Sequence, residues 1–234
     1  MKKTRLKYDR SFFEGIKEGS FRSAMRIIPL VKELVPIRSV VDVGCGAGSW
    51  LKAFQKIGTK SIFGVDGNQT PVLEIPRERF LRVDLDKPFI LQEKFDLAVS
   101  LEVAEHLSPA SADQLVANLT NLAPAVLFSS AIPGQGGEHH INEQWPGYWA
   151  EKFEKRGFLA FDCLRLKTWE DPSVEWWYSQ NILLYVKKGY SRKSPKLASW
   201  VASEPPARLI HPQSLTILTH LNRVKGKLLK KIGF

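Results

Sequence analysis

Cysteine is scarce in this chain, and long apolar stretches are missing. Two cysteines among 234 residues, Cys45 and Cys163, are too few for a disulfide framework, which argues against a small secreted scaffold. No apolar run approaches the roughly 20 residues that a membrane-spanning helix needs. The first residues are basic, but charged residues interrupt them where a signal peptide would have its apolar core. We therefore expect a soluble protein of a reducing cytoplasm.

Acidic residues are scarce at both ends of the chain, so the net charge of +10 is unevenly distributed. Residues 1–38 contain 10 Lys and Arg against 4 Asp and Glu, and residues 187–234 contain 11 against 1. Residues 39–186 are acidic, with 13 against 19. Basic ends suit contact with an anionic membrane surface, with nucleic acid or with a phosphorylated substrate. The alternative is that they serve solubility alone.

The middle of the chain alternates short β-branched runs with helical patterns, which is typical of a doubly wound parallel α/β sheet. Helices are expected directly after the first strand, from Pro109 to about Leu122, and from about Pro146 to Arg156. A loop rich in glycine and histidine covers residues 131–145. Strands are expected at residues 39–43, 61–65, 80–83, 95–100, 125–130, 158–166 and 181–187.

We divide the chain into residues 1–38, 39–188 and 189–234. The first part holds an aromatic helix, Tyr8–Phe21, that we expect to form a lid over the carboxyl ends of the strands. The last part is a proline-containing linker followed by a basic amphipathic helix over residues 215–232. Its leucine face suits either an anionic lipid surface or docking onto the central domain or a second subunit of a homodimer.

Acidic residues near three successive strand ends suit a cationic nucleoside. The first strand runs into Gly44-Cys45-Gly46-Ala47-Gly48, a turn that lets a ligand approach the backbone at a helix N-terminus. Asp42, just before it, would repel a pyrophosphate but suits a positive group, which favours S-adenosylmethionine over NAD. Asp66, after the second strand, is placed to accept hydrogen bonds from a ribose diol. Asp84 and Leu85, after the third strand, suit an adenine ring.

Four segments resemble the successive motifs of the class I S-adenosylmethionine-dependent methyltransferases: VVDVGCGAGSW (40–50), FGVDGN (63–68), VDLDKPF (83–89) and FDLAVSLEVAEHL (95–107). The resemblance covers about residues 20–187. It implies a Rossmann-like seven-stranded sheet with an antiparallel last strand, and in-line transfer of a methyl group from a sulfonium. The cofactor-binding residues it implies are Asp42, Gly44, Cys45, Gly46, Asp66, Gly67, Asp84, Leu85, Leu101 and Glu102.

Three further segments are similar to a bacterial group associated with glycan and secondary-metabolite biosynthesis: residues 8–24, 129–149 and 175–186. This similarity implies O-methylation of a sugar or another small polyhydroxylated acceptor. The acceptor is expected between the N-terminal lid and the 131–149 region. The residues predicted to contact it are Tyr8, Phe12, His106, Trp145 and Trp149.

A hydroxyl must lose its proton to accept a methyl group, and a loop histidine can take that proton near neutral pH. The candidates are His139 and His140, which as neighbours should point in different directions, together with Glu143. Glu102, Glu105, His106 and His139 form a second arrangement, in which Mg or Mn would activate the hydroxyl.

The metal arrangement resembles small-RNA 2′-O-methyltransferases and some quinone-biosynthesis methyltransferases. An RNA ribose methyltransferase is therefore the alternative enzyme, although the sequence has no recognisable RNA-binding module. The alternative that is not an enzyme is a non-catalytic cofactor-binding partner subunit.

Overall fold

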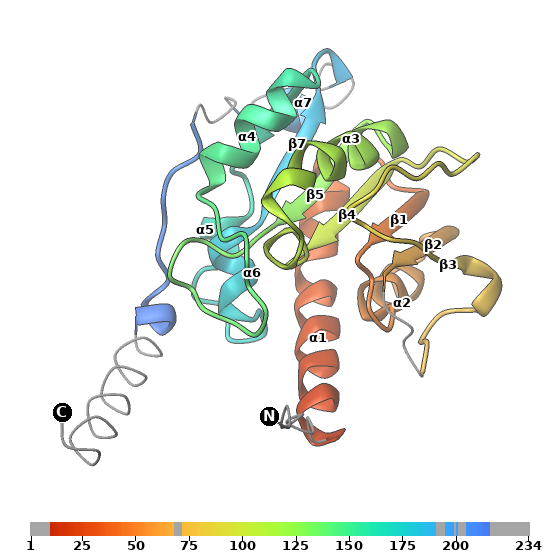
Figure 1. Cartoon of the computed structure of the whole chain (residues 1–234), viewed down its shortest axis with the longest axis horizontal. Helices are drawn as coiled ribbons and strands as arrows, with labels where there is room; N and C mark the ends of the chain where they lie inside the picture. The colour runs from red at the N-terminus through yellow and green to blue at the C-terminus, as the bar shows by residue number, and fades with distance from the viewer. Residues whose placement is uncertain (1–9, 68–71, 191–194, 199, 201–204, 216–234) are drawn as a thin grey trace, which may run out of the picture.

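The computed structural model describes residues 10–67, 72–190, 195–198, 200 and 205–215. Its centre is a seven-stranded sheet with the order β3-β2-β1-β4-β5-β7-β6 (Figure 1). β1 pairs in parallel with β2 and β4, whereas β7 is antiparallel to both neighbours. The predicted Rossmann-like sheet with an antiparallel last strand is therefore confirmed. The strands are β1 Ser39–Val43, β2 Ser61–Asp66, β3 Phe80–Arg82, β4 Leu97–Leu101, β5 Ala125–Ser129, β6 Phe158–Phe161 and β7 Leu183–Lys187.

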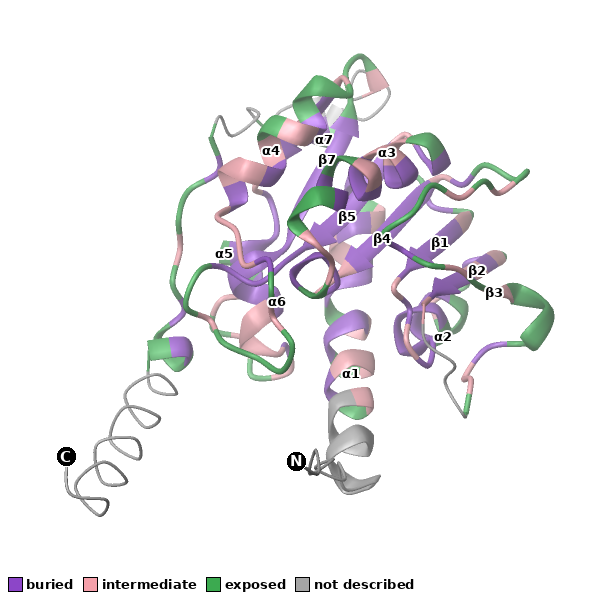
Figure 2. Cartoon of the chain, in the orientation of Figure 1, coloured by how far each residue is buried: buried purple, intermediate pink, exposed green. Residues whose placement is uncertain are grey.

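Helices cover both faces of the sheet, so the central strands β1, β4 and β5 are buried except at Ser39 and Leu101, which are half-buried (Figure 2). Leu97 and Val99 of β4 pack with α1 and α2, while Ala98 between them packs with α3 and α4 on the other face. Burial on both faces explains why the strands are apolar runs rather than alternating ones. The helices are α1 Arg10–Leu34, α2 Ser49–Lys56, α3 Ala112–Leu122, α4 Pro146–Lys155, α5 Arg165–Thr168, α6 Trp176–Asn181 and α7 Pro195–Ala198, with short 3-10 turns η1 Arg77–Arg79, η2 Ala104–His106 and η3 Pro109–Ser111.

The N-terminal helix is longer than predicted, and its second half belongs to the core. Ile27, Ile28 and Val31 of α1 are fully buried against the sheet, so residues 1–38 do not form a part separate from the central domain. The first half of α1 extends past the sheet on the side of the strands' carboxyl ends, where a lid was expected (Figure 1). Tyr8 lies outside the described residues, and of Phe12 only its place on α1 is described.

The chain between β5 and β7 differs from the expected pair of long strands. β6 ends at Phe161 because Asp162 turns back to form an ion pair with the buried Arg165, whose Nε lies 2.8 Å from Oδ1 of the aspartate. α5 and then α6 follow, and β7 begins only at Leu183. α6 was not predicted, because its sequence WWYSQN is rich in residues of weak helix propensity.

The segments after β7 return to the domain instead of leaving it as a linker. Leu197 of α7 is fully buried, and Pro206, His211 and Ser214 are buried further along. The predicted boundary near residue 189 therefore does not separate two units. Nearly all of the predicted basic helix, residues 216–232, lies outside the described residues. Within the described ranges, no helix has the length and apolar character needed to span a bilayer.

Candidate active site

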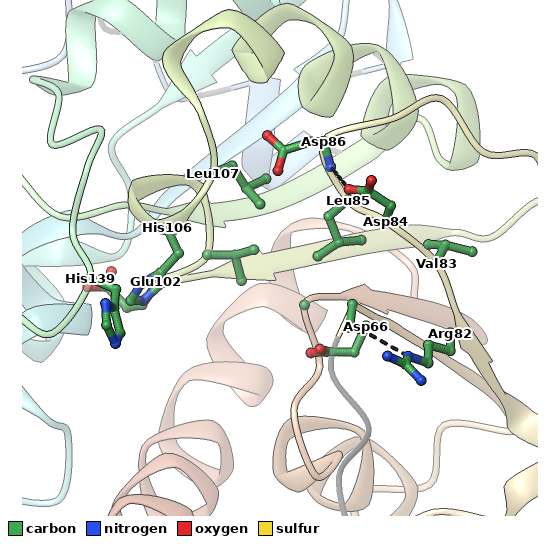
Figure 3. A pocket seen from close by; sticks show the side chains of 13 residues that line it. Asp66, Arg82, Val83, Asp84, Leu85, Asp86, Glu102, His106, Leu107 and His139 are labelled. Carbon is green, nitrogen blue, oxygen red and sulfur yellow. Dashed lines mark hydrogen bonds between the residues drawn. The ribbon is translucent and has the colours of Figure 1, made fainter. Parts of the chain in front are cut away.

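A cavity of about 770 Å³ lies at the carboxyl ends of β1 to β4 (Figure 3). Ligands bind at this edge of doubly wound sheets because the loops there diverge to opposite faces. One end of the cavity is formed by residues after β2 and β3, and the other by residues after β4 and by the 131–145 loop, as Figure 3 shows. The lining residues are Gly44, Asp66, Gly67, Arg82, Val83, Asp84, Leu85, Asp86, Glu102, Val103, His106, Leu107 and His139.

Asp66 ends β2 and reaches from it into the cavity (Figure 3). Its Oδ2 accepts a hydrogen bond of 2.8 Å from the backbone N–H of Gly46. Arg82 donates from Nε to the carbonyl oxygen of Gly67 at 3.2 Å, which ties the start of the β2 loop to β3. The predicted ribose and adenine residues, Asp66, Asp84 and Leu85, thus line one end of the cavity together.

The glycine turn after β1 allows the chain to pass close to the cavity. Gly44 has a φ of +87°, and a Cβ there would lie 2.3 Å from a methyl carbon of Val103. Gly46 has a φ of +54°, and a Cβ added there would meet no atom within 4 Å, so its outer side is open. Burial raises the pKa of the Cys45 thiol, so the thiol stays protonated and is no nucleophile.

Asp42 is buried in β1 and is not among the residues that line the cavity. Burial, and then the nearby carboxylate of Asp66, raises its pKa to about 8. The predicted direct contact of Asp42 with a cofactor is therefore not supported by the geometry. With a pKa of about 8, the Asp42 carboxyl is mostly protonated near neutral pH, so its contribution to the site is structural rather than that of a negative charge.

Glu102 follows β4 and is held by an extensive set of hydrogen bonds. It has a φ of +53°, which is uncommon for a residue with a side chain. Asn181 donates from Nδ2 to both carboxylate oxygens, at 3.1 and 3.3 Å, and Gln135 donates from Nε2 to Oε2 at 3.1 Å. Burial raises the pKa of Glu102, whereas these donors favour its ionised form.

Glu105, His106 and His140 bring their possible ligand atoms within 4.8 Å of one another. Glu105 is fully buried, and neither of its carboxylate oxygens makes a hydrogen bond of normal geometry within the described part of the chain. Burial and the charge of Glu102 raise the pKa of Glu105 well above its usual range. The His106 ring meets the His140 ring edge-on at 4.9 Å, and burial lowers the pKa of His106.

This cluster differs from the predicted metal set. His140, not His139, shares the group with Glu105 and His106, and Glu102 is occupied by amide donors instead. The donor set nonetheless fits a divalent ion, because it joins two imidazoles with a buried carboxyl group that has no hydrogen-bond partner of normal geometry among the described residues.

His140 and Glu143 form a hydrogen-bonded pair in the loop. Nδ1 of His140 lies 3.0 Å from Oε1 of Glu143, and the two side chains are 12% and 19% exposed. The Glu143 carboxylate also accepts the backbone N–H groups of Gly134 and Gly136, at 2.7 and 2.8 Å. His139 differs from His140: its side chain is 85% exposed and lines the cavity, whereas His140 is not among the lining residues and lies next to His106, which is.

Two tryptophans predicted to contact the acceptor lie elsewhere. Trp149 is buried in the core against Phe128, with ring centroids 5.1 Å apart, so its assignment to an acceptor wall is wrong. Trp145 is half-buried at the start of α4 and faces the guanidinium of Arg208 at 5.2 Å instead of the cavity. His106, by contrast, lines the cavity as predicted.

The residues present fit S-adenosylmethionine on structural grounds. The cavity is long, its glycine turn is open at Gly46, and Asp66 is held at the edge where ribose hydroxyls bind in such sheets. Acidic side chains, Asp66, Asp84 and Glu102 among them, dominate the charged part of its lining. A cation is therefore favoured over a pyrophosphate.

The fold and the cavity together define a Rossmann-like methyltransferase architecture. A family model described as a methyltransferase domain matches residues 16–165, more than half of the chain. The chain therefore belongs to the methyltransferase domain family, and it is an S-adenosylmethionine-dependent methyltransferase. No curated protein sequence matches it significantly.

Several solved structures share the fold. DesVI from Streptomyces venezuelae aligns with a TM-score of 0.58 and 14% identity, covering 78% of this chain and 100% of that one. Magnesium protoporphyrin IX methyltransferase (ChlM) from Synechocystis PCC 6803, with bound S-adenosylmethionine, aligns at 0.53 and 16%, covering 80% and 87%. The methyltransferase domain of bacterial CtHen1-C aligns at 0.53 and 20%, covering 71% and 97%.

Sequence reasoning missed the amide side chains that surround Glu102. Gln135 and Asn181 lie 33 and 79 residues away from it along the chain. Glutamine and asparagine are common in loops and at helix ends, so no local pattern distinguished these two. The single usable signal was their place in the two segments, 129–149 and 175–186, that resemble the narrower bacterial group.

Proposed function

We propose that the protein methylates a hydroxyl oxygen of a sugar or another small polyhydroxylated acceptor, with His140 as the general base. The observation that carries this proposal is the hydrogen bond between Nδ1 of His140 and Glu143. It favours the tautomer with a proton on Nδ1, which leaves a lone pair on Nε2. A base oriented by a carboxylate in this way is typical of catalytic histidines.

Each group has a distinct task in the proposed reaction. S-adenosylmethionine supplies an electrophilic methyl group when bound. Asp66 binds the ribose hydroxyls, and Asp84 and Leu85 bind the adenine. His140 would take the proton of the acceptor hydroxyl on Nε2, which would make that oxygen a nucleophile for the methyl group that the cofactor supplies. Glu143 stabilises the imidazolium that results, because a carboxylate favours the charged form of a neighbouring histidine.

The polyhydroxylated acceptor is supported by two observations. The chemical end of the cavity is polar, with Glu102, His106 and His139 along its wall, which suits hydrogen bonding to several hydroxyl groups. The loop and α6 segments are also those that resemble the group associated with glycan biosynthesis.

A matched pair of histidine variants tests the proposal. The assay uses methyl-labelled S-adenosylmethionine with a panel of monosaccharides, nucleotide sugars and short RNA, followed by mass spectrometry of the product. With the accepted substrate, His140→Ala is expected to lower turnover about 10²-fold or more, with S-adenosylhomocysteine affinity largely kept. His139→Ala, its exposed neighbour in the cavity wall, is the comparison: it should raise the KM for the acceptor while kcat is largely kept.

Two outcomes would contradict the proposal. Wild-type turnover in His140→Ala would exclude His140 as the base. Methylation of RNA alone would favour the ribose methyltransferase.

Metal assistance is a second candidate mechanism, favoured by the unpartnered carboxylate of Glu105. Glu105, His106 and His140 would hold a divalent ion, which would lower the pKa of an acceptor hydroxyl. The His140–Glu143 bond is compatible with this alternative, because ligand histidines usually donate their other N–H to a carboxylate. Mn²⁺ binding followed by electron paramagnetic resonance, in the wild type and in Glu105→Gln, separates the two mechanisms. Bound Mn²⁺ lost in the variant supports the metal, and activity indifferent to EDTA removes it.

A further inference from the structure

Residues 205–215, here named the C-terminal strap, contact the end of the 131–145 loop at Trp145. Arg208 places its guanidinium 5.2 Å from the ring centre of Trp145, where the loop meets α4. His211 is buried: Nε2 lies 2.9 Å from the carbonyl oxygen of Trp169, and its ring lies 4.7 Å from the Trp169 ring and 6.5 Å from that of Trp176. The strap is therefore anchored by packing as well as by hydrogen bonds.

A continuous chain of hydrogen bonds leads from the strap to the cavity. The backbone N–H of His211 donates to Oε1 of Gln180 at 2.8 Å, and Nε2 of Gln180 donates to Oε1 of Gln135 at 2.8 Å. Gln135 in turn donates to the carboxylate of Glu102 at 3.1 Å. Asn181 joins the same chain, because its Nδ2 donates to both Gln135 and Glu102. Gln180 lies on α6 and Glu102 follows β4, yet the single side chain of Gln135 connects them.

The direction of every bond in this chain is fixed by its two ends. A backbone N–H can only donate, so Gln180 must present its oxygen to His211. Its amide nitrogen then faces Gln135, which must present its own oxygen to Gln180 and its nitrogen to Glu102. The carboxylate oxygens of Glu102 accept the bonds from Gln135 and Asn181, so every donor in the chain meets an acceptor. The same orientation is supported by two further bonds, from Gln180 Nε2 to Oδ1 of Asn181 at 3.1 Å and from the Ile132 N–H to Oε1 of Gln135 at 3.3 Å. If the strap N–H is withdrawn, Gln180 loses the acceptor bond that ties this arrangement to the strap.

We propose that the C-terminal strap positions the active site, with Gln180 as the positioning residue that transmits its placement to Glu102 and the 131–145 loop. Gln135 is the branch point, since it lies in that loop and also contacts Glu102 directly. The loop carries His140, so the proposal rests on the proposed function where it concerns the base. Its effect on Glu102, which lines the cavity, is independent of the acceptor.

Two variants of the full chain test the proposal without any acceptor. His211→Ala removes the anchoring ring, and Gln180→Glu keeps the acceptor for His211 but loses the donor to Gln135. We measure S-adenosylhomocysteine binding by calorimetry and the side-chain signals of His106 and His140 by nitrogen-15 histidine NMR. Both variants are expected to bind S-adenosylhomocysteine about tenfold more weakly, as for the loss of one buried hydrogen bond, and to shift both imidazole signals.

Gln114→Glu is the matched control, because Gln114 also donates to an amide oxygen, that of Asn118, but on α3. It should change neither affinity nor signals. If the strap merely covers the surface, His211→Ala and Gln180→Glu will lower thermal stability and leave both readouts at wild-type values, which overturns the proposal. A response to Gln180→Glu with none to His211→Ala would overturn the role of the strap. A wrong acceptor assignment would change neither result.

Discussion

The backbone N–H of Gly46 donates a hydrogen bond of 2.8 Å to Oδ2 of Asp66, joining the turn after β1 to the end of β2. The bond fixes one oxygen of the carboxylate before any ligand binds, and so it orients the other. It also holds the glycine turn against β2, where Gly44 and Cys45 both donate to the carbonyl oxygen of Val65. The end of the cavity that we propose for the ribose is therefore preorganised, which reduces the entropy lost on binding.

Replacing Asp66 by Ala is expected to weaken S-adenosylhomocysteine binding by about 1–3 kcal/mol, because the ribose loses its acceptor and the turn loses its anchor. Asp66→Asn keeps one oxygen acceptor and should lose less. Calorimetry on both variants, with circular dichroism to confirm folding, measures the difference. An affinity equal to that of wild type in folded Asp66→Ala would show that the ribose binds elsewhere.

The raised pKa of Asp42, about 8, predicts how stability changes with pH. The unfolded chain has the ordinary carboxyl pKa of 3.8, so between these values the folded protein binds more protons than the unfolded one. Stability from this group is therefore present at low pH and is lost as pH rises toward 8, with a slope of up to about 1.4 kcal/mol per pH unit.

Asp42→Asn removes this pH dependence, because an amide does not titrate. Urea unfolding without cofactor at pH 5, 6, 7 and 8 should show the variant gaining stability over the wild type with each step. Asp113→Asn, at an exposed position on α3, is the control and should follow the wild type. A constant difference between Asp42→Asn and wild type would mean that Asp42 is ionised in the folded protein.

Much of this fold could be predicted because its signals are local. The strand before Gly44, the glycine turn and the aspartate at the end of β2 lie within a few residues of the geometry they produce. Asp66 and Asp84 follow adjacent parallel strands, so their places at one edge follow from topology alone.

The rest depends on contacts between distant segments. The donors to Glu102 come from Gln135 and Asn181, which no periodic pattern connects. The same applies to Trp149: its aromatic ring suited a sugar-binding wall, but the helix period turns it toward Phe128 in the core. Neither of the two histidines could be preferred from sequence. The backbone of the loop, not its composition, decides that the His139 side chain is exposed to solvent and that of His140 is mostly buried.

A core variant provides a stability test that does not involve the site. The ring of Phe153 stacks on Tyr185 with centroids 3.9 Å apart and meets Phe128 at 5.4 Å, and it is fully buried. Phe153→Ala is expected to lower the free energy of unfolding by about 3–5 kcal/mol, through lost burial and a residual cavity. Lys155→Ala, on the exposed side of the same helix, should change it by less than about 0.5 kcal/mol. Urea denaturation of the two variants checks the contrast.

Gly137 lies directly over the imidazole of His140, and this contact gives the last prediction. A Cβ at position 137 would lie 2.2 Å from Nε2 of His140 and 2.3 Å from Cε1, closer than any real contact allows. Glu143 holds the other side of the ring, so Gly137→Ala must displace the imidazole or break its bond to Glu143. We expect turnover to fall about 10²-fold, as for loss of a general base, while S-adenosylhomocysteine affinity stays at its wild-type value.

Gly147→Ala is the matched control, because its new Cβ would meet only Pro205, at 3.5 Å, an ordinary contact. Nitrogen-15 histidine NMR can follow His140 in both variants before any acceptor is known. In Gly137→Ala the Nδ1 signal should lose the signature of a carboxylate-bound proton, and in Gly147→Ala it should not. An unshifted His140 signal in a folded Gly137→Ala protein would contradict this prediction. It would mean that the loop backbone moves to make room for the methyl group, while the bond between His140 and Glu143 stays intact.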